Sequence, residues 1–201
     1  MKLYYSPGAC SLASHIVLRE AGVSVDLEKV ALATRTTESG ADFAAINPKG
    51  YVPALVLEDG SLLTEGVAIM QYVAEANPHA GLAPKDALSR ARVQEALNYL
   101  GTEVHKSFSP LFKPWTTEEG KAQAREMVLK RLGLIETQLA DGRDWLLGDA
   151  PTVADFYLFV ITNWAGHVAV SLDGFPNLNA LRARIAARPA VQAALKAEGL
   201  I

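Results

Sequence analysis

The pattern of this chain changes at one proline-rich stretch, and this change constrains the fold more than any other feature. Residues 77–85 read Asn-Pro-His-Ala-Gly-Leu-Ala-Pro-Lys, and two prolines around a glycine are typical of a linker. Strand and helix patterns alternate before it, whereas only helical patterns follow it. We therefore expect an α/β domain over residues 1–77, a linker over 78–86 and an all-helical domain over 87–201.

The first domain is predicted to follow the order β-α-β-α-β-β-α. Its strands are expected over residues 2–5, 25–30, 54–57 and 61–63, and its helices over residues 11–21, 42–45 and 65–76. The last two strands flank Glu58-Asp59-Gly60, and Asp-Gly between apolar runs favours a hairpin.

The second domain is predicted to contain helices alone. They are expected over residues 87–108, 118–139, 152–160, 177–187 and 189–197. Thr152 and Asp155 have the spacing of a capping box, and the apolar run at 156–160 is typical of a helix buried in the centre of a bundle.

Composition excludes several classes of protein. Half of the 201 residues are hydrophobic, so the chain can bury a core, and a net charge of −3 does not favour nucleic-acid binding. One cysteine cannot form an internal disulfide, and four scattered histidines offer no metal-ligand spacing. We find no signal peptide and no membrane span of about 18 apolar residues, so we expect a cytoplasmic protein without a metal.

The single cysteine, Cys10, lies in Tyr-Tyr-Ser-Pro-Gly-Ala-Cys-Ser, where a strand meets a Pro-Gly turn and a helix. Unpaired N–H groups and the helix dipole favour an anion at this position, so we expect a lowered thiol pKa. The alternative is a buried structural cysteine, which is the commoner role of an unpaired cysteine.

Three further groups of residues have patterns that fit a binding site. Pro53 precedes a strand, and a cis bond there would expose the backbone of Val52 to an extended ligand, although a trans turn is commoner. Glu65 and Gly66 begin a helix that could hold a carboxylate and an ammonium, or Glu65 could simply complement the helix dipole. His105 lies on one helix face with Asn98, where a solvated polar face is the alternative.

Together these segments resemble a cytosolic glutathione transferase of the bacterial beta class, over essentially the whole chain. The resemblance depends on the segments 4–11, 47–50, 52–53, 63–69 and 103–106, and on the capping box. It implies a thioredoxin-like domain followed by the helical domain of that family, glutathione as co-substrate and a homodimer.

The resemblance also implies roles for individual residues. Cys10, Ser11 and His105 would be catalytic. The residues implied to bind glutathione are Cys10, Arg35, Val52, Pro53, Glu65, Gly66, Asn98, Glu103, His105 and Lys106. The second-substrate pocket would involve Phe108, Leu111, Phe112 and Trp115, although these aromatic side chains could equally belong to the core or to a dimer interface.

The predicted activity is conjugation of glutathione to hydrophobic electrophiles, a detoxification reaction, with thiol–disulfide or peroxidase side activity at Cys10. The resemblance implies a mixed disulfide between Cys10 and glutathione. Ala13 stands where a second cysteine would be needed for a local resolving thiol. The alternatives are a glutaredoxin-like oxidoreductase, a non-catalytic glutathione- or ligand-binding protein, and a dehalogenase or isomerase on the same fold.

Overall fold

The computed structural model describes residues 1–201, which divide into two compact units. Met1–Ala83 and Ala187–Ile201 form the first unit, and Pro84–Ala186 form the second. The division between residues 83 and 84 falls inside the predicted linker. The range 87–201 is nevertheless not one compact unit, because its last segment returns to the first unit, and chain order alone does not reveal such long-range packing.

The first unit contains one five-stranded sheet with the order β3-β2-β1-β4-β5. Its strands are β1 (Lys2–Tyr5), β2 (Asp26–Ala31), β3 (Thr36–Thr37), β4 (Ala54–Val56) and β5 (Leu62–Thr64). β1 pairs in parallel with β2 and antiparallel with β4, and the outer pairs are antiparallel. Only β3 was not predicted, because two residues are too short to show the alternation of a strand.

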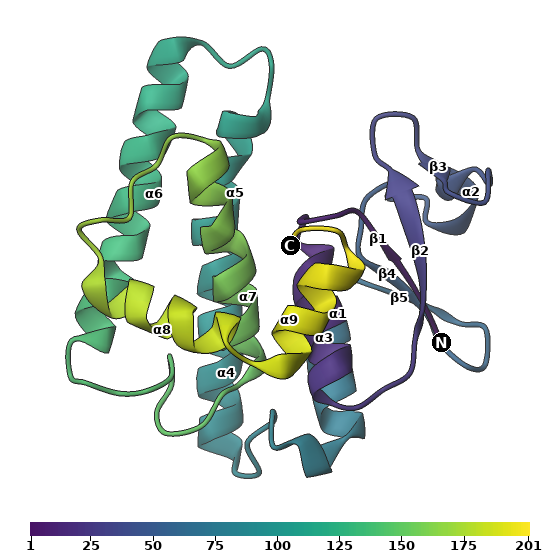
Figure 1. The fold of residues 1–201 in the computed structure, drawn as a ribbon, viewed down its shortest axis with the longest axis horizontal. Helices are drawn as coiled ribbons and strands as arrows, with labels where there is room; N and C mark the ends of the chain where they lie inside the picture. Colours follow the sequence, from purple (N-terminus) through teal and green to yellow (C-terminus); the bar gives the residue numbers. More distant parts are fainter. The chain divides into compact units, whose positions relative to one another are not determined.

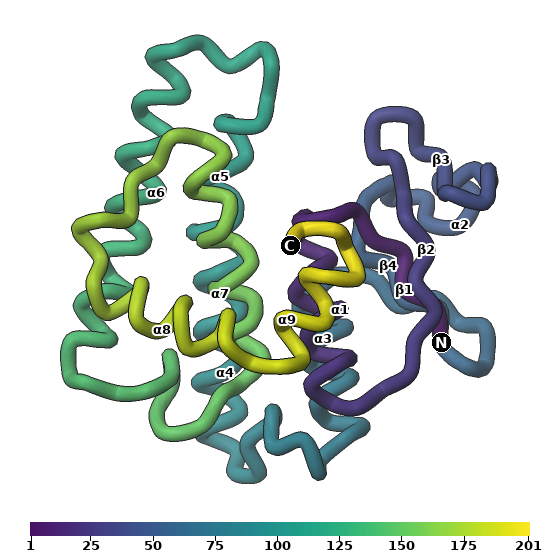
Figure 2. The backbone as a smooth tube through the Cα atoms, in the orientation of Figure 1, coloured from purple at the N-terminus to yellow at the C-terminus, as the bar shows by residue number.

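Helices cover both faces of this sheet. α1 (Ser11–Glu20), α3 (Gly66–Ala76) and α9 (Pro189–Ala197) lie together on one face, as Figures 1 and 2 show. The short helix α2 (Phe43–Ile46) covers the other face, where Phe43 packs against Tyr4 of β1. Neighbouring side chains of a strand point to opposite faces, so Tyr5 contacts His15 of α1 instead. A 3₁₀ turn, η1 (Pro78–Ala80), follows α3.

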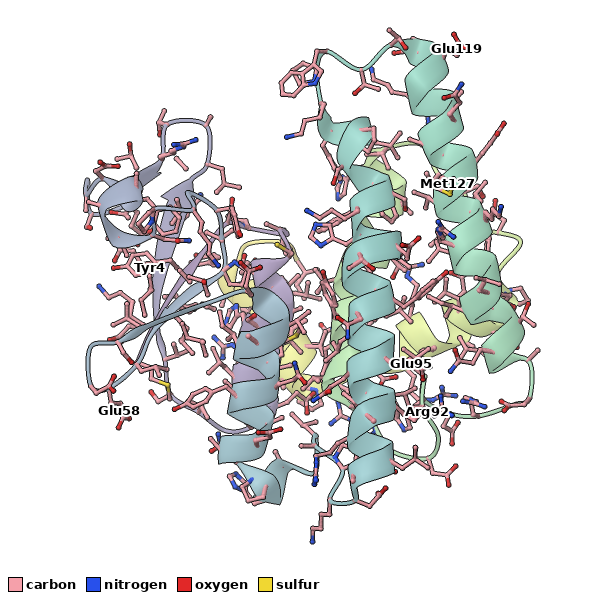
Figure 3. The ribbon with its side chains drawn as sticks, turned by 180° about the vertical axis from the view of Figure 1, so that it is seen from behind. Tyr4, Glu58, Arg92, Glu95, Glu119 and Met127 are labelled. Carbon is pink, nitrogen blue, oxygen red and sulfur yellow. The ribbon has the colours of Figure 1, made fainter.

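The second unit is entirely helical. Its elements are α4 (Ala87–Tyr99), η2 (Leu100–His105), α5 (Lys106–Phe108), η3 (Ser109–Phe112), α6 (Glu118–Leu139), α7 (Val153–Asn163), η4 (Trp164–His167) and α8 (Pro176–Ala186). Figure 3 labels Glu119 in the acidic first turn of α6. Every residue of α7 from Val153 to Thr162 is buried, and the capping box of Thr152 and Asp155 begins this helix as predicted.

The predicted helix over residues 87–108 is not a single α-helix. Its middle turn, η2, is π-helical, and it separates α4 from α5. Short π segments occur often at functional sites, since they rotate the side chains that follow them. The face that Asn98 and His105 would share on a regular helix is therefore altered. None of the helices has the length and apolar character that crossing a bilayer requires.

Candidate functional site

Cys10 occupies the N-cap position of α1, at the end of the turn that follows β1. Gly8 has a φ of +68°, a conformation that glycine adopts without strain, and this allows the tight turn. The partly exposed thiol of Cys10 donates to the carbonyl oxygen of Val52, with Sγ and O 3.3 Å apart. The predicted position of the thiol at a helix N-terminus is confirmed.

Ser11, which the family resemblance implied to be catalytic, makes its described hydrogen bonds within the loop before α1. Its buried hydroxyl accepts from the N–H of Ser6 and donates to the carbonyl of Ser6, both at 3.2 Å. Its one proton is therefore used within the loop, and the N-cap position belongs to Cys10. Ser11 thereby holds the loop that carries the thiol, and its catalytic role stays a prediction.

The C-terminal segment holds the same loop from the other side. Glu198 accepts from the N–H of Gly8 at 3.0 Å, and its second oxygen lies 2.9 Å from Nδ1 of His15. Arg19 donates to Nε2 of His15 at 2.8 Å, so the ring proton of His15 is on Nδ1 and points to Glu198. The side chains of His15 and Glu198 are completely buried. No local sequence signal predicts this contact.

The peptide bond between Val52 and Pro53 is cis, which is the less common of the two alternatives that the sequence left open. The Pro53 ring lies beside Gly66 at the start of α3, where an added Cβ would lie 3.4 Å from Cγ of Pro53. The same Cβ would lie 3.7 Å from Oγ of Ser14, a buried hydroxyl oxygen that has no hydrogen-bond partner. Gly66 therefore leaves room beside an unsatisfied polar atom.

Glu65 lies between β5 and α3 in a left-handed conformation, with a φ of +69°. One carboxylate oxygen, Oε1, accepts from Nζ of Lys49 at 2.5 Å and from the hydroxyl of Tyr51 at 2.8 Å. These bonds raise the pKa of Lys49 and of Tyr51, because Glu65 stabilises their protonated forms. Glu65 was predicted as a site residue from the sequence, whereas Lys49 and Tyr51 were not.

Arg35 is brought to the same group of loops. An added Cβ on Gly50 would lie 3.4 Å from the central guanidinium carbon of Arg35. Asn47 fixes this loop, because its side-chain amide donates to the carbonyl of Tyr51 at 2.8 Å. One end of the first unit thus presents two cations, one carboxylate and the unpaired N–H groups of a helix terminus. Such a set can bind a ligand that carries both an ammonium and carboxylates.

His105, in the second unit, is packed among aromatic side chains. Its Nδ1 lies 2.7 Å from the hydroxyl oxygen of Tyr157, and its ring meets Trp164 edge-on at 4.8 Å between centroids. Burial, assisted by the charge of Lys106, lowers the pKa of His105 to about 4. The imidazole is therefore neutral near pH 7 and can offer a hydrogen bond.

Trp164 connects two of the four residues predicted for the second-substrate pocket. Phe108, which is buried, meets it at 5.7 Å, and the half-exposed Phe112 meets it at 5.8 Å, both nearly edge-on. Trp115 is 76% exposed and lies under the ammonium of Lys113, outside this cluster. Leu111, which precedes Phe112 in the sequence, is partly buried.

The other predicted residues of the second unit are more exposed. Glu103 forms an ion pair with Arg131 at 2.5 Å within the unit, so its carboxylate is already engaged. The side chains of Asn98 and Lys106 are exposed, and only the backbone carbonyl of Asn98 takes part in a described hydrogen bond, from Thr102. The structure does not assign these residues a ligand.

Tyr157 and Trp164 were missed because they follow His105 by more than fifty residues and lie in or next to an apolar run. A buried tyrosine normally finds a hydrogen-bond partner for its hydroxyl, and this was the one available signal at Tyr157. No cluster of three or more histidine, cysteine or acidic side chains suited to a metal ion is present.

A separate pocket of about 610 Å³ lies on the second unit between α4, the end of α6 and the segment that follows α6. Two of its charged residues, Arg92 and Glu95 on α4, form an ion pair at 2.7 Å (Figure 3), and Arg143 pairs with Asp141 outside the lining. None of the predicted site residues lines this pocket.

Comparisons with known proteins agree across the whole chain. Residues 8–76 match the N-terminal domain of glutathione S-transferase, and residues 99–189 match its C-terminal domain. Glutathione S-transferase GstA of Escherichia coli O157:H7 is 51% identical over 201 residues, with 100% of both chains covered. The solved structure of a sphingomonad glutathione S-transferase complexed with glutathione has a TM-score of 0.96 and is 51% identical. The structure of the bacterial beta class glutathione S-transferase of Sphingomonas chungbukensis has a TM-score of 0.96 and is 50% identical. Both comparisons cover 100% of each chain.

Proposed function

The chain belongs to the glutathione S-transferase family and is a transferase, and we propose that it conjugates glutathione to hydrophobic electrophiles. Its 51% identity to GstA supports the transferase activity, and its likeness to a structure complexed with glutathione supports the co-substrate. We further propose that it acts as a cytoplasmic homodimer in detoxification, since the resemblance to the beta class implies this assembly and role.

Glu65 carries the proposal for glutathione. Its carboxylate would take the ammonium of the γ-glutamyl group, while the N–H groups at the start of α3, beginning with Gly66, would take the carboxylate of that group. Arg35 would bind the glycine carboxylate, and the backbone of Val52 would pair with the cysteinyl residue. We keep Pro53, Asn98, Glu103 and Lys106 as further binding candidates.

The reaction needs a glutathione thiolate. The N-terminus of α1 favours this anion, and the thiolate would attack an electrophilic carbon to form a C–S bond while the leaving group departs with its electron pair. We assign the electrophile to the aromatic cluster of Phe108 and Phe112 around Trp164. His105 would act as a neutral hydrogen-bond donor, because its pKa of about 4 leaves it unprotonated near pH 7.

A second candidate function is thiol–disulfide exchange at Cys10. The thiol bonds to the same Val52 carbonyl that we propose for the cysteinyl residue of glutathione, and this contact supports the candidate. The Cys10 thiolate would displace a thiolate RS⁻ from a mixed disulfide RS–SG and become Cys10–SG. A second glutathione thiolate would then release oxidised glutathione and regenerate Cys10, because Ala13 offers no resolving thiol.

Replacing Glu65 with glutamine tests the main proposal. We expect E65Q to raise the KM for glutathione about 10- to 100-fold, since a hydrogen bond to a charged group is worth roughly 1.5–3 kcal/mol. The matched control is E58Q in the β4–β5 turn, an exposed carboxylate labelled in Figure 3, which is expected to leave this KM unchanged. Both variants are assayed with an activated aryl chloride as electrophile.

The ligand can be varied in the same experiment. A glutathione analogue without the α-amino group is expected to lose affinity for the wild-type protein and to lose little more for E65Q, because the partner of the ammonium is already missing. An unchanged glutathione KM in E65Q, or an equal penalty for the analogue in both proteins, would contradict the role of Glu65. No turnover by the wild-type protein with glutathione and any aryl halide would contradict conjugation.

A further inference from the structure

Tyr157 lies in α7, the buried central helix, and only 6% of its surface is exposed. Its hydroxyl oxygen lies 2.7 Å from Nδ1 of His105, in the last position of the π-helical turn η2. The two rings are 6.0 Å apart and nearly perpendicular. α7 and η2 pack against each other within the second unit, so this contact joins two elements of one compact body.

We propose that Tyr157 is a positioning residue, which donates its phenolic proton to Nδ1 of His105 and thereby fixes the imidazole tautomer that carries its proton on Nε2. A neutral imidazole has one donor and one acceptor nitrogen. An imidazole nitrogen is a far stronger base than a phenolic oxygen, so the bond O–H···N is favoured over N–H···O. A separation of 2.7 Å is also typical of a hydroxyl donor, whereas N–H donors favour about 2.9–3.0 Å.

The packing around the ring supports this assignment. Trp164 meets the imidazole edge-on at 4.8 Å on another side, so the ring is held by two aromatic residues from α7 and η4. Rotation of the imidazole ring about the Cβ–Cγ bond of His105 would break its hydrogen bond to Tyr157. Tyr157 therefore controls both the orientation of His105 and the nitrogen that remains available to a ligand.

The consequence for the reaction depends on the proposed function. With its proton fixed on Nε2, His105 offers a neutral donor to an anion that forms during transfer, either the thiolate or the departing group. The other tautomer would offer a lone pair there and repel the same anion. Tyr157 would then act on the rate of transfer through His105, without contacting glutathione.

The test begins with the tautomer, which can be measured without any turnover. Nitrogen-15 NMR of the full-length protein, with His105 assigned from the spectrum of H105Q, is expected to show a protonated Nε2 and an unprotonated Nδ1. In Y157F the two nitrogens are expected to shift towards the average of both tautomers. The matched control is Y99F, because the hydroxyl of Tyr99 also donates within this unit, to the carbonyl of Arg131 at 2.9 Å, but does not contact His105. Y99F is expected to leave the His105 signals unchanged.

Kinetics then separate positioning from general stability. We expect Y157F to lower kcat/KM for an activated aryl chloride on the order of 10-fold, with the KM for glutathione unchanged and Y99F unaffected. In the H105Q background the same substitution is expected to have no further effect, because Tyr157 acts through His105. A protonated Nδ1 in the wild-type protein, or an unchanged tautomer in Y157F, would overturn the proposal. A correct tautomer in a wild-type protein without transfer activity would instead overturn the proposed function.

Discussion

The loops around Cys10 and the aromatic cluster around Trp164 are built in different ways. Around Cys10, charged side chains lie in loops and remain open to solvent, since the side chains of Lys49 and Glu65 are 46% and 54% exposed. Around Trp164, rings from four helical elements exclude water strongly enough to lower the pKa of His105 to about 4. The first region is therefore suited to recognition by charge and hydrogen bonds, and the second to apolar contact and a neutral hydrogen-bond donor.

The largest effect is expected at the first region, from removal of the Cys10 sulfur. We expect C10A to lower the rate of thiol–disulfide exchange more than about 100-fold, because the attacking nucleophile is absent. Conjugation is expected to change less than about 10-fold, since the N-terminus of α1 and the backbone of Val52 remain. The two rates are measured on one preparation, with a glutathione mixed disulfide and with an activated aryl chloride.

C10S is the matched variant, because it restores a polar hydrogen atom without a comparable nucleophile. It is expected to behave like C10A in exchange. Exchange at the wild-type rate in either variant would show that Cys10 is not the nucleophile, and a parallel loss of both reactions would show that the two chemistries depend on the same sulfur.

The aromatic cluster around Trp164 is expected to make the stability of the protein depend on pH, through His105. The pKa of His105 is about 4 in the folded protein against an ordinary 6.5, so the unfolded chain binds more protons between these values. The free energy of unfolding is therefore highest above pH 6.5, where His105 is neutral in both states. It falls as the pH decreases from 6.5 to 4, because protons bind the unfolded chain first. The difference corresponds to about 3 kcal/mol in the free energy of unfolding.

Urea unfolding of the wild-type protein and H105Q at pH values from 7.5 to 4 measures this difference. H105Q is expected to lose less stability than the wild-type protein over that range. H79Q, which changes an exposed histidine in η1, is the control and is expected to follow the wild-type curve. Parallel curves for the wild-type protein and H105Q would mean that the aromatic cluster does not exclude water as described.

The smallest effect is expected from substitution of Gly66, which lies beside Pro53 and Ser14. G66A and G66S both place a Cβ in ordinary contact with Pro53 and restrict the unfolded chain, which stabilises the protein by about 0.4–1 kcal/mol. The serine hydroxyl can also reach the unsatisfied Oγ of Ser14, so G66S is expected to be about 1 kcal/mol more stable than G66A. Equal melting temperatures for the two variants would exclude this bond.

The sequence predicted those features that depend on neighbouring residues. The turn before α1 located Cys10, the capping box located the start of α7, and the Val52-Pro53 step offered a cis bond as one of two alternatives. Each signal lies within a few residues, where local chemistry determines the backbone. Glutathione as the co-substrate was implied by the family resemblance and not by these local signals.

Contacts between distant parts of the chain were not predictable in this way. Tyr157 follows His105 by 52 residues, and Glu198 follows Gly8 by 190. Such pairs are set by the packing of whole helices, which a hydrophobic pattern indicates only as burial. The π-helical turn η2 was missed for a related reason, because its one unusual residue, Gly101, weakens a helix without indicating a change in hydrogen bonding.

The position of α9 has a consequence for how the protein is made. This helix is translated after all the other elements of the first unit, yet Glu198, just after it, accepts a hydrogen bond from the amide of Gly8 and lies against the ring of His15. Domains generally complete their folding in the order of synthesis. Here we expect residues 84–186 to finish packing first, because the strands translated before them belong to a unit that also needs residues 187–201.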